Sequence, residues 1–240
     1  MFKRLANIIK KRGLREMPII ILKGLFFRLG MVLSFIPKKT RSDAAEGRKI
    51  FLNRNLIYNT KGYWHVNPMP SENDLNNYYE KTYRSSFGLD FGVTKRDIRH
   101  YQILKNVDPG FDDKRKKILN FGAGNGGISI ILHLLGHDVT NVEPSGMIKF
   151  FLTRWVTVKS LSEIKNIKYD LIYGSHSLEH VQDIDKTNKL LDKISKKTTI
   201  FFWEVPNANH PNSGSRLNII DVPHTYYFDM SFLSQRTLRH

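Results

Sequence analysis

The sequence predicts an α/β protein with a doubly wound, mostly parallel sheet. From residue 117 onward, short apolar or β-branched runs alternate with helix-like segments, which is typical of parallel strands joined by crossover helices. A glycine-rich turn, GAGNGG at 122–127, directly follows the first of these runs. Such turns hold nucleotides at the start of a helix. We therefore expect a ligand beyond the carboxyl ends of the strands.

Three regions are expected along the chain. Residues 1–41 form a basic, apolar, helical N-terminal arm, and 42–110 form a lead-in segment of short strands and helices. Residues 111–240 form the cofactor-binding α/β domain. In the lead-in segment, β-branched and aromatic residues between Asn and Gly turns in 50–67 indicate a strand pair. Ser71 with Asp74 is typical of a capping box that opens a helix, and 93–108 indicates another helix.

Within 111–240 the elements alternate regularly. The expected strands are 117–124, 138–145, 156–160, 169–177 and 197–207, and the expected helices are 126–137, 146–155 and 178–195. After residue 207 the sequence predicts a loop and a helix over 229–240. A sheet built this way lacks closing strands after the fifth strand, and its open edge is a hazard unless a partner or a second copy covers it.

The net charge of +16 is concentrated in the arm. Residues 1–41 hold eleven Lys or Arg against one acid, Glu16. Such a bias suggests nucleic acid, but the basic residues alternate with the apolar stretch 17–37, so no nucleic acid is expected. Lys23 and Arg28 interrupt that stretch, which argues against a membrane span. We expect a cytoplasmic protein whose arm contacts the inner face of an anionic membrane; the alternative is an arm packed on the domain or on a second subunit.

The glycine turn alone does not identify the nucleotide. Gly122, Gly124 and Gly127 fit the dinucleotide pattern, whereas Gly122, Gly124 and Gly126 fit a methyltransferase pattern. Glu143 ends the second strand of the domain, where an acid can accept hydrogen bonds from both ribose hydroxyls in either class. The absence of cysteine excludes disulfides, thiolate zinc sites and cysteine nucleophiles.

Two strand ends separate the classes. The fourth strand runs into SHSLEH at 175–180, the fifth into EVPN at 204–207, and PHTYYF follows at 223–228. With the lead-in NPMPSENDLNNYYEKTY, these motifs resemble class I S-adenosylmethionine-dependent methyltransferases over residues 50–235. The resemblance is greatest to bacterial enzymes that act on sugars, lipopolysaccharide or natural products and carry a His-x-Leu-Glu-His signature. It implies S-adenosyl-L-methionine as the cofactor and a glycan or other small-molecule acceptor, with a place in surface polysaccharide biosynthesis.

The turn, the strand ends and the resemblance together predict the site. The cofactor-binding candidates are Asn120, Phe121, Gly122, Ala123, Gly124, Asn125, Gly126, Glu143, Pro144, Ser160, Leu161, Ser175, His176, Tyr79 and Tyr83. The catalytic candidates, which include bases for an oxygen or carbon acceptor, are His176, His180, His224, Tyr226 and Glu204. The 223–228 segment has an alternative reading as a packed loop over the core.

Several features depart from the family pattern. Asn120 stands where the family usually has an acid, and an amide cannot pair with the cofactor's ammonium group. The cysteine zinc knuckle of many relatives is absent. His176 and His180 are spaced like a metal pair, but no third ligand stands at a clear spacing, so no metal is expected.

Two other functions remain open from the sequence. One is a non-catalytic or truncated methyltransferase-fold partner subunit. The missing closing strands and Asn120 are the two features that favour it. The other is a nicotinamide-dependent oxidoreductase, which is disfavoured because no Tyr-x-x-x-Lys lies beside the fourth strand.

Overall fold

The computed structural model describes residues 47–79, 93–144 and 156–237. The predicted arm, the predicted helix over 146–155 and Tyr83 lie outside the described residues. None of the helices among the described residues combines the length and apolar character that a membrane span requires.

Five parallel strands form the main sheet. They are β3 (Lys117–Phe121), β4 (Asp138–Val142), β5 (Val156–Val158), β6 (Tyr169–Ser175) and β7 (Ser195–Glu204). Their order is β5-β4-β3-β6-β7, and every neighbouring pair is parallel. The strand order reverses between β3 and β6, so the carboxyl ends of these two strands flank the switch point where doubly wound sheets bind ligands. This confirms the predicted fold and strands.

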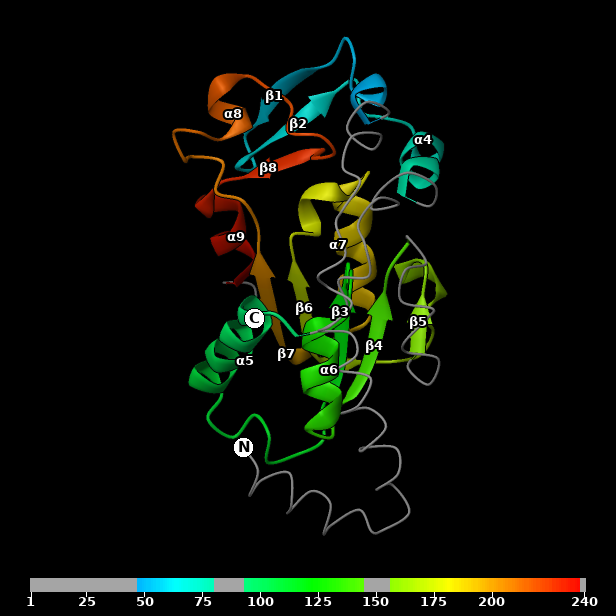
Figure 1. The fold of residues 1–240 in the computed structure, drawn as a ribbon, viewed down its shortest axis with the longest axis vertical. Helices are drawn as coiled ribbons and strands as arrows, with labels where there is room; N and C mark the ends of the chain where they lie inside the picture. The colour runs from blue at the N-terminus through cyan, green and yellow to red at the C-terminus, as the bar shows by residue number, and fades with distance from the viewer. Residues whose placement is uncertain (1–46, 80–92, 145–155, 238–240) are drawn as a thin grey trace, which may run out of the picture.

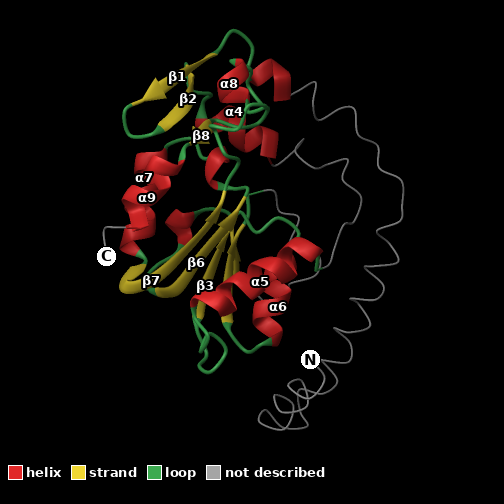
Figure 2. Cartoon of the chain, turned by 90° about the vertical axis from the view of Figure 1, so that its left-hand side faces the viewer, coloured by secondary structure: helices red, strands yellow, loops and turns green. Residues whose placement is uncertain are grey.

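Alternating side chains give this sheet a core on each face. Ile118 packs with Leu132 of α6 (Gly127–Leu134) and Leu104 of α5 (Lys95–Val107) on one face. Its neighbour Leu119 packs with Leu191 of α7 (Ile184–Lys193) on the other. Figure 2 shows α5 and α6 on one side of the sheet and α7 on the opposite side. The apolar runs are continuous because both faces of the strands are buried.

A second, antiparallel sheet lies over the carboxyl ends of the main strands (Figure 1). It consists of β1 (Asn55–Asn59), β2 (Tyr63–Asn67) and β8 (Tyr226–Phe228), in that order. The first two strands confirm the predicted strand pair, and β8 brings the PHTYYF segment back from the far end of the chain to pair with β2. Tyr226, one of the predicted catalytic residues, therefore lies in this second sheet and not in the main sheet.

The lead-in and C-terminal helices follow the sequence closely. Ser71 caps α4 (Glu72–Asn77) by accepting a hydrogen bond from the backbone N of Asp74. A capping box of Thr94 and Asp97 starts α5. The loop predicted after residue 207 is wrong in two places, because the short helix α8 (Gly214–Leu217) and the strand β8 form within it, whereas α9 (Met230–Thr237) confirms the expected last helix. Within the described ranges no further strand pairs with β7, which agrees with the expected open edge.

The helix predicted over 178–195 is wrong in its first third. Leu178–His180 form the single 3-10 turn η5, and α7 begins only at Ile184. Asp183 accounts for the later start, because it is extended and its side chain accepts a hydrogen bond from the backbone N of Lys186. An aspartate that caps in this way stands outside the helix. His180 therefore does not lie one helical turn after His176.

Candidate active site

The glycine turn is held open by backbone geometry and by the neighbouring strand. Gly122, Gly124 and Gly126 all have positive φ, of 69°, 54° and 73°. The backbone N atoms of Gly122 and Ala123 both donate to the carbonyl oxygen of Val142, at 2.9 and 3.0 Å. A side chain at residue 122 would collide with Ser177. At this position the protein itself, and not only a ligand, requires glycine.

Glu143 supports the same turn from the end of β4. Its side chain is buried, and Oε2 accepts a hydrogen bond of 2.6 Å from the backbone N of Gly124. The predicted ribose acceptor thus lies directly beside the glycine turn. Pro144, the last described residue before the gap, continues from this strand end.

Asn120 lies beneath the turn in a buried polar network. Its Nδ2 donates to Ser129 Oγ at 2.7 Å, and that hydroxyl donates to Asn141 Oδ1 at 2.6 Å. The amide is therefore linked through Ser129 to Asn141, which joins β3, α6 and β4 next to the turn. An aspartate here could not donate the first of these bonds.

The other predicted cofactor residues have identifiable neighbours. Phe121 contacts Trp203 edge to face, and Asn125 Oδ1 lies 3.4 Å from the backbone N of Gly127. Ser160 caps the 3-10 turn η4 (Leu161–Glu163), and Leu161 is buried in the core. Tyr79 is buried, with its ring centroid 6.1 Å from that of His180. Leu161 and Tyr79 thus have packing roles whether or not they reach the cofactor.

His176 stands where β6 meets the site and faces two carboxylates. Its φ is +49°, and its backbone N donates to the carbonyl oxygen of Glu204. Its Nδ1 lies 3.3 Å from Glu179 Oε1, and its Nε2 lies 3.6 Å from Glu204 Oε2. Contact with Glu179 raises the pKa of His176, against the opposing effect of partial burial. A left-handed conformation in a non-glycine residue costs energy and is common at functional positions.

Glu204, at the end of β7, is surrounded by donors. Ser175 Oγ donates to its Oε2 at 2.5 Å, and His100 Nε2 lies 3.2 Å from its Oε1. Burial alone would raise the pKa of Glu204, but the Ser175 hydrogen bond and the nearby His100 and His176 hold it below its usual value. The carboxylate is thus kept charged beside His176.

Sequence reasoning missed His100 and Arg96, both on α5. His100 is buried, and its Nδ1 lies 2.7 Å from the hydroxyl of Tyr173. Arg96 Nη1 lies 3.8 Å from Glu204 Oε2. A histidine on the same helix face as the buried Leu104 was the one available signal, and such a histidine needs a buried polar partner.

The structure brings Glu179, His180 and His224 together. Glu179 is 1% exposed, and the ring centroids of His180 and His224 are 4.9 Å apart. Burial would raise the pKa of Glu179, but the nearby His176, His180 and His224 hold it below its usual value. Burial lowers the pKa of His224.

The hydroxyl of Tyr226 forms hydrogen bonds with the backbone at the start of α7. It accepts from the backbone N of Ile184 at 3.3 Å and donates to the carbonyl oxygen of Gln182 at 3.4 Å. Burial raises its pKa to about 12. The residue therefore secures the start of α7, and its hydroxyl is already bonded there rather than directed to His176.

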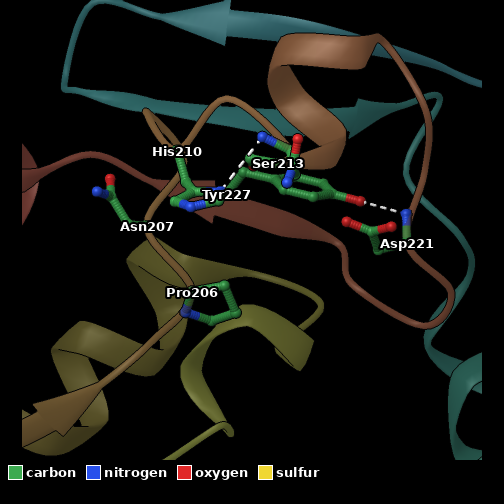
Figure 3. Close-up of a pocket in the computed structure, with 7 residues that line it drawn as sticks. Pro206, Asn207, His210, Ser213, Asp221 and Tyr227 are labelled. Atoms are coloured by element: carbon green, nitrogen blue, oxygen red, sulfur yellow. Dashed lines mark hydrogen bonds between the residues drawn. The ribbon is translucent and has the colours of Figure 1, made fainter.

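A cavity of about 280 Å³ opens beyond Glu204, between the end of β7 and β8 (Figure 3). Six of the seven residues that line it have a polar side chain. In Figure 3 the Tyr227 hydroxyl accepts a hydrogen bond from the backbone N of Asp221. The lining residues are Pro206, Asn207, His210, Asn212, Ser213, Asp221 and Tyr227.

The sheet order, the glycine turn at the switch point and the acid after β4 define a nucleotide-binding domain of the class I methyltransferase type. The chain belongs to the methyltransferase domain family, whose sequence model matches residues 96–240. S-adenosylmethionine is the cofactor of this domain. The residues present fit it, because Gly122, Gly124 and Gly126 leave three positions of the turn without side chains and Glu143 lies directly beside Gly124.

Solved structures share part of this fold. The glycopeptide N-methyltransferase MtfA is 13% identical, with 49% of this chain and 56% of that chain covered and a TM-score of 0.39. DhpI in complex with SAM and HEP is 15% identical, with coverage of 60% and 78% and a TM-score of 0.42. TehB from Haemophilus influenzae is 16% identical, with coverage of 68% and 54% and a TM-score of 0.42.

The matched region spans about half the length of MtfA and TehB. No curated protein matches the chain. The family assignment therefore rests on the match to the family's sequence model.

Proposed function

We propose that the chain transfers a methyl group from S-adenosylmethionine to a hydroxyl of a sugar, glycolipid or related small acceptor, as in surface polysaccharide biosynthesis. One observation carries the proposal. His176 stands in a left-handed conformation at the carboxyl end of β6, with Glu179 and Glu204 beside its two ring nitrogens. An imidazole placed in this way suits a base that takes a proton from an acceptor hydroxyl.

The chain's residues have separate tasks in such a transfer. The bound cofactor supplies an electrophilic methyl group, and the protein aligns the acceptor with it and excludes water. Glu179, next to Nδ1, orients the imidazole. Glu204 lies 3.6 Å from Nε2, wider than a hydrogen bond, so an acceptor hydroxyl can replace it as the partner of that nitrogen. His176 then takes the hydroxyl proton as the oxygen attacks.

The lining of the cavity beyond Glu204 supports a hydroxyl-rich acceptor. Amide, hydroxyl, imidazole and carboxylate groups line it, and its volume is about 280 Å³. Such groups recognise sugar hydroxyls by hydrogen bonding. Two lining residues, Pro206 and Asn207, lie two and three positions after Glu204, whose carboxylate faces the proposed base His176.

We also propose that the basic arm holds the enzyme against an anionic membrane surface, where lipid-linked acceptors are available. The support is the sequence of residues 1–41, in which eleven Lys or Arg alternate with apolar residues. Each basic residue near such a surface contributes about 1 kcal/mol. The apolar side chains add burial at the headgroup boundary.

Calorimetry with S-adenosylmethionine, S-adenosylhomocysteine and NAD, run side by side, tests the cofactor. Transfer of a labelled methyl group to sugar nucleotides, lipid-linked sugars and peptide controls tests the acceptor class. We expect binding of the first two nucleotides and labelling of hydroxyl-rich acceptors. NAD binding without a response to S-adenosylmethionine would overturn the activity, and labelling of peptides alone would overturn the acceptor class.

A further inference from the structure

We propose that Glu179, His180 and His224 form a binding site for a divalent transition-metal ion of the zinc class. One potential ligand atom of each side chain lies within 4.8 Å of the other two. One carboxylate and two imidazoles are a ligand set that zinc uses in sites with a fourth, open position. Imidazole ligands suit zinc, iron, copper and nickel, whereas magnesium and calcium prefer oxygen, so the set selects against the latter.

Glu179 supplies the strongest reason for a cation here. Its side chain is 99% buried, and neither carboxylate oxygen makes a well-aligned hydrogen bond within the described part of the chain. Its close neighbours are the imidazoles of His176, at 3.3 Å, and His180, at 4.0 Å. A buried charge is costly unless it is paired or coordinates a metal.

The ring nitrogens of His180 and His224 have surroundings that are typical of metal-binding histidines. His180 Nδ1 lies 3.5 Å from the carbonyl oxygen of Pro223, while its Nε2 faces Glu179. Metal-binding histidines commonly give their other ring N–H to a carbonyl or carboxylate. His224 Nδ1 is buried without a hydrogen-bond partner among the described residues.

The backbone fixes these three residues before any ion binds. Thr225 donates from its backbone N and its Oγ1 to the carbonyl oxygen of Glu179, at 2.8 and 2.9 Å. The same hydroxyl lies 2.6 Å from the carbonyl oxygen of Val181. The segment that carries His224 is therefore tied to the turn that carries Glu179 and His180. Ligands around zinc lie roughly 3.5 Å apart, so the three ligand atoms, which lie within 4.8 Å of one another, would have to move closer together to bind an ion.

The full-length protein, free of purification tags and stripped with a chelator, is titrated with Zn²⁺, Co²⁺ and Mg²⁺ by calorimetry. We expect one Zn²⁺ per chain, no comparable Mg²⁺ binding and a visible absorption band for Co²⁺ in a low-coordinate site. His180→Ala and His224→Ala should each weaken Zn²⁺ binding by about 100-fold or more, since even supporting residues contribute 10- to 100-fold. His210→Ala, an exposed histidine of the cavity, is the matched control and should bind as the wild type does.

The proposal would be overturned if the wild-type protein is folded by circular dichroism but binds no stoichiometric Zn²⁺. Glu179, His180 and His224 would then form an ion-pair cluster only. Binding that survives the His180→Ala/His224→Ala double substitution would overturn the proposal too, because the ion would then sit elsewhere. If an alanine variant does not fold, His224→Gln and the Zn²⁺-induced rise in wild-type Tm decide. None of these measurements needs methyl transfer, so a failed cofactor or acceptor assay leaves the result interpretable.

Discussion

The carboxylate of Glu143 accepts a hydrogen bond of 2.6 Å from the backbone N of Gly124, so the end of β4 and the glycine turn form one unit. Substitution of this acid therefore removes a turn contact as well as the proposed ribose acceptor. Glu143→Ala should weaken S-adenosylmethionine binding by about 1 to 3 kcal/mol, measured by calorimetry. Asp192→Ala, at an exposed position on α7, should bind normally. Unchanged affinity in Glu143→Ala would remove this residue from the cofactor site.

Gly122→Ala should destabilise the fold by about 2 kcal/mol or more, because the left-handed conformation alone costs 1 to 2 kcal/mol in a residue with a Cβ. Collision with Ser177 adds to this. Urea denaturation measures the loss. In a Ser177→Gly background the collision is relieved, so the same substitution should cost less there. Equal costs in both backgrounds would show that Ser177 does not restrict this position.

His176→Ala should reduce methyl transfer by about 10²- to 10⁴-fold, the usual contribution of a general base. Affinity for S-adenosylmethionine should change little, because the imidazole is assigned to the acceptor side. Initial rates and calorimetry on the same preparation separate the two effects. His133→Ala, in the last turn of α6, serves as the control for the loss of a histidine outside the proposed site. Full activity in His176→Ala would exclude this residue as the base.

The stability contributed by Glu204 should depend on pH. Because its folded-state pKa lies below the ordinary value of 4.5, its stabilisation is present above that pH and is lost as pH falls through the folded-state pKa. Glu204→Gln should therefore lower the free energy of unfolding at pH 7 and differ progressively less from wild type below pH 4.5. Denaturation curves from pH 3.5 to 7 measure this. A difference that does not depend on pH would contradict the assigned charge interactions.

Binding of the arm to membranes should be partial and sensitive to salt. The attraction of exposed charges falls off within a Debye length of about 8 to 10 Å. Vesicles with anionic lipid should sediment the full chain at low salt, and neutral vesicles or high salt should release most of it. Replacement of Lys10, Lys11, Arg12 and Arg15 by Gln should weaken sedimentation. Equal recovery of both proteins in the supernatant would indicate that the arm serves packing or assembly.

The sequence by itself determined the sheet and the place of the glycine turn, and the resemblance of SHSLEH and EVPN to methyltransferase motifs implied the cofactor. Strands such as 117–121 and 169–175 are apolar on both faces, and the glycine turn follows its strand directly, so local pattern was sufficient. The sequence also contained a signal for the start of α7, because Asp183 is a residue type that commonly caps helices. The helix was predicted to start too early because the apolar residues after Leu178 are spaced as in a helix.

Only the tertiary structure decided which side chains meet. Thr225 bonds to Glu179 across 46 residues of chain, and that contact places His224 beside His180. His100 contacts Glu204 from a helix, predicted over 93–108, to which the sequence assigned no functional residue. The strand β8 (Tyr226–Phe228) likewise pairs with β2 (Tyr63–Asn67), which lies far from it in the sequence. Spacing along the sequence reports contacts within one helix or strand, whereas these contacts depend on how loops return over the carboxyl ends of the sheet.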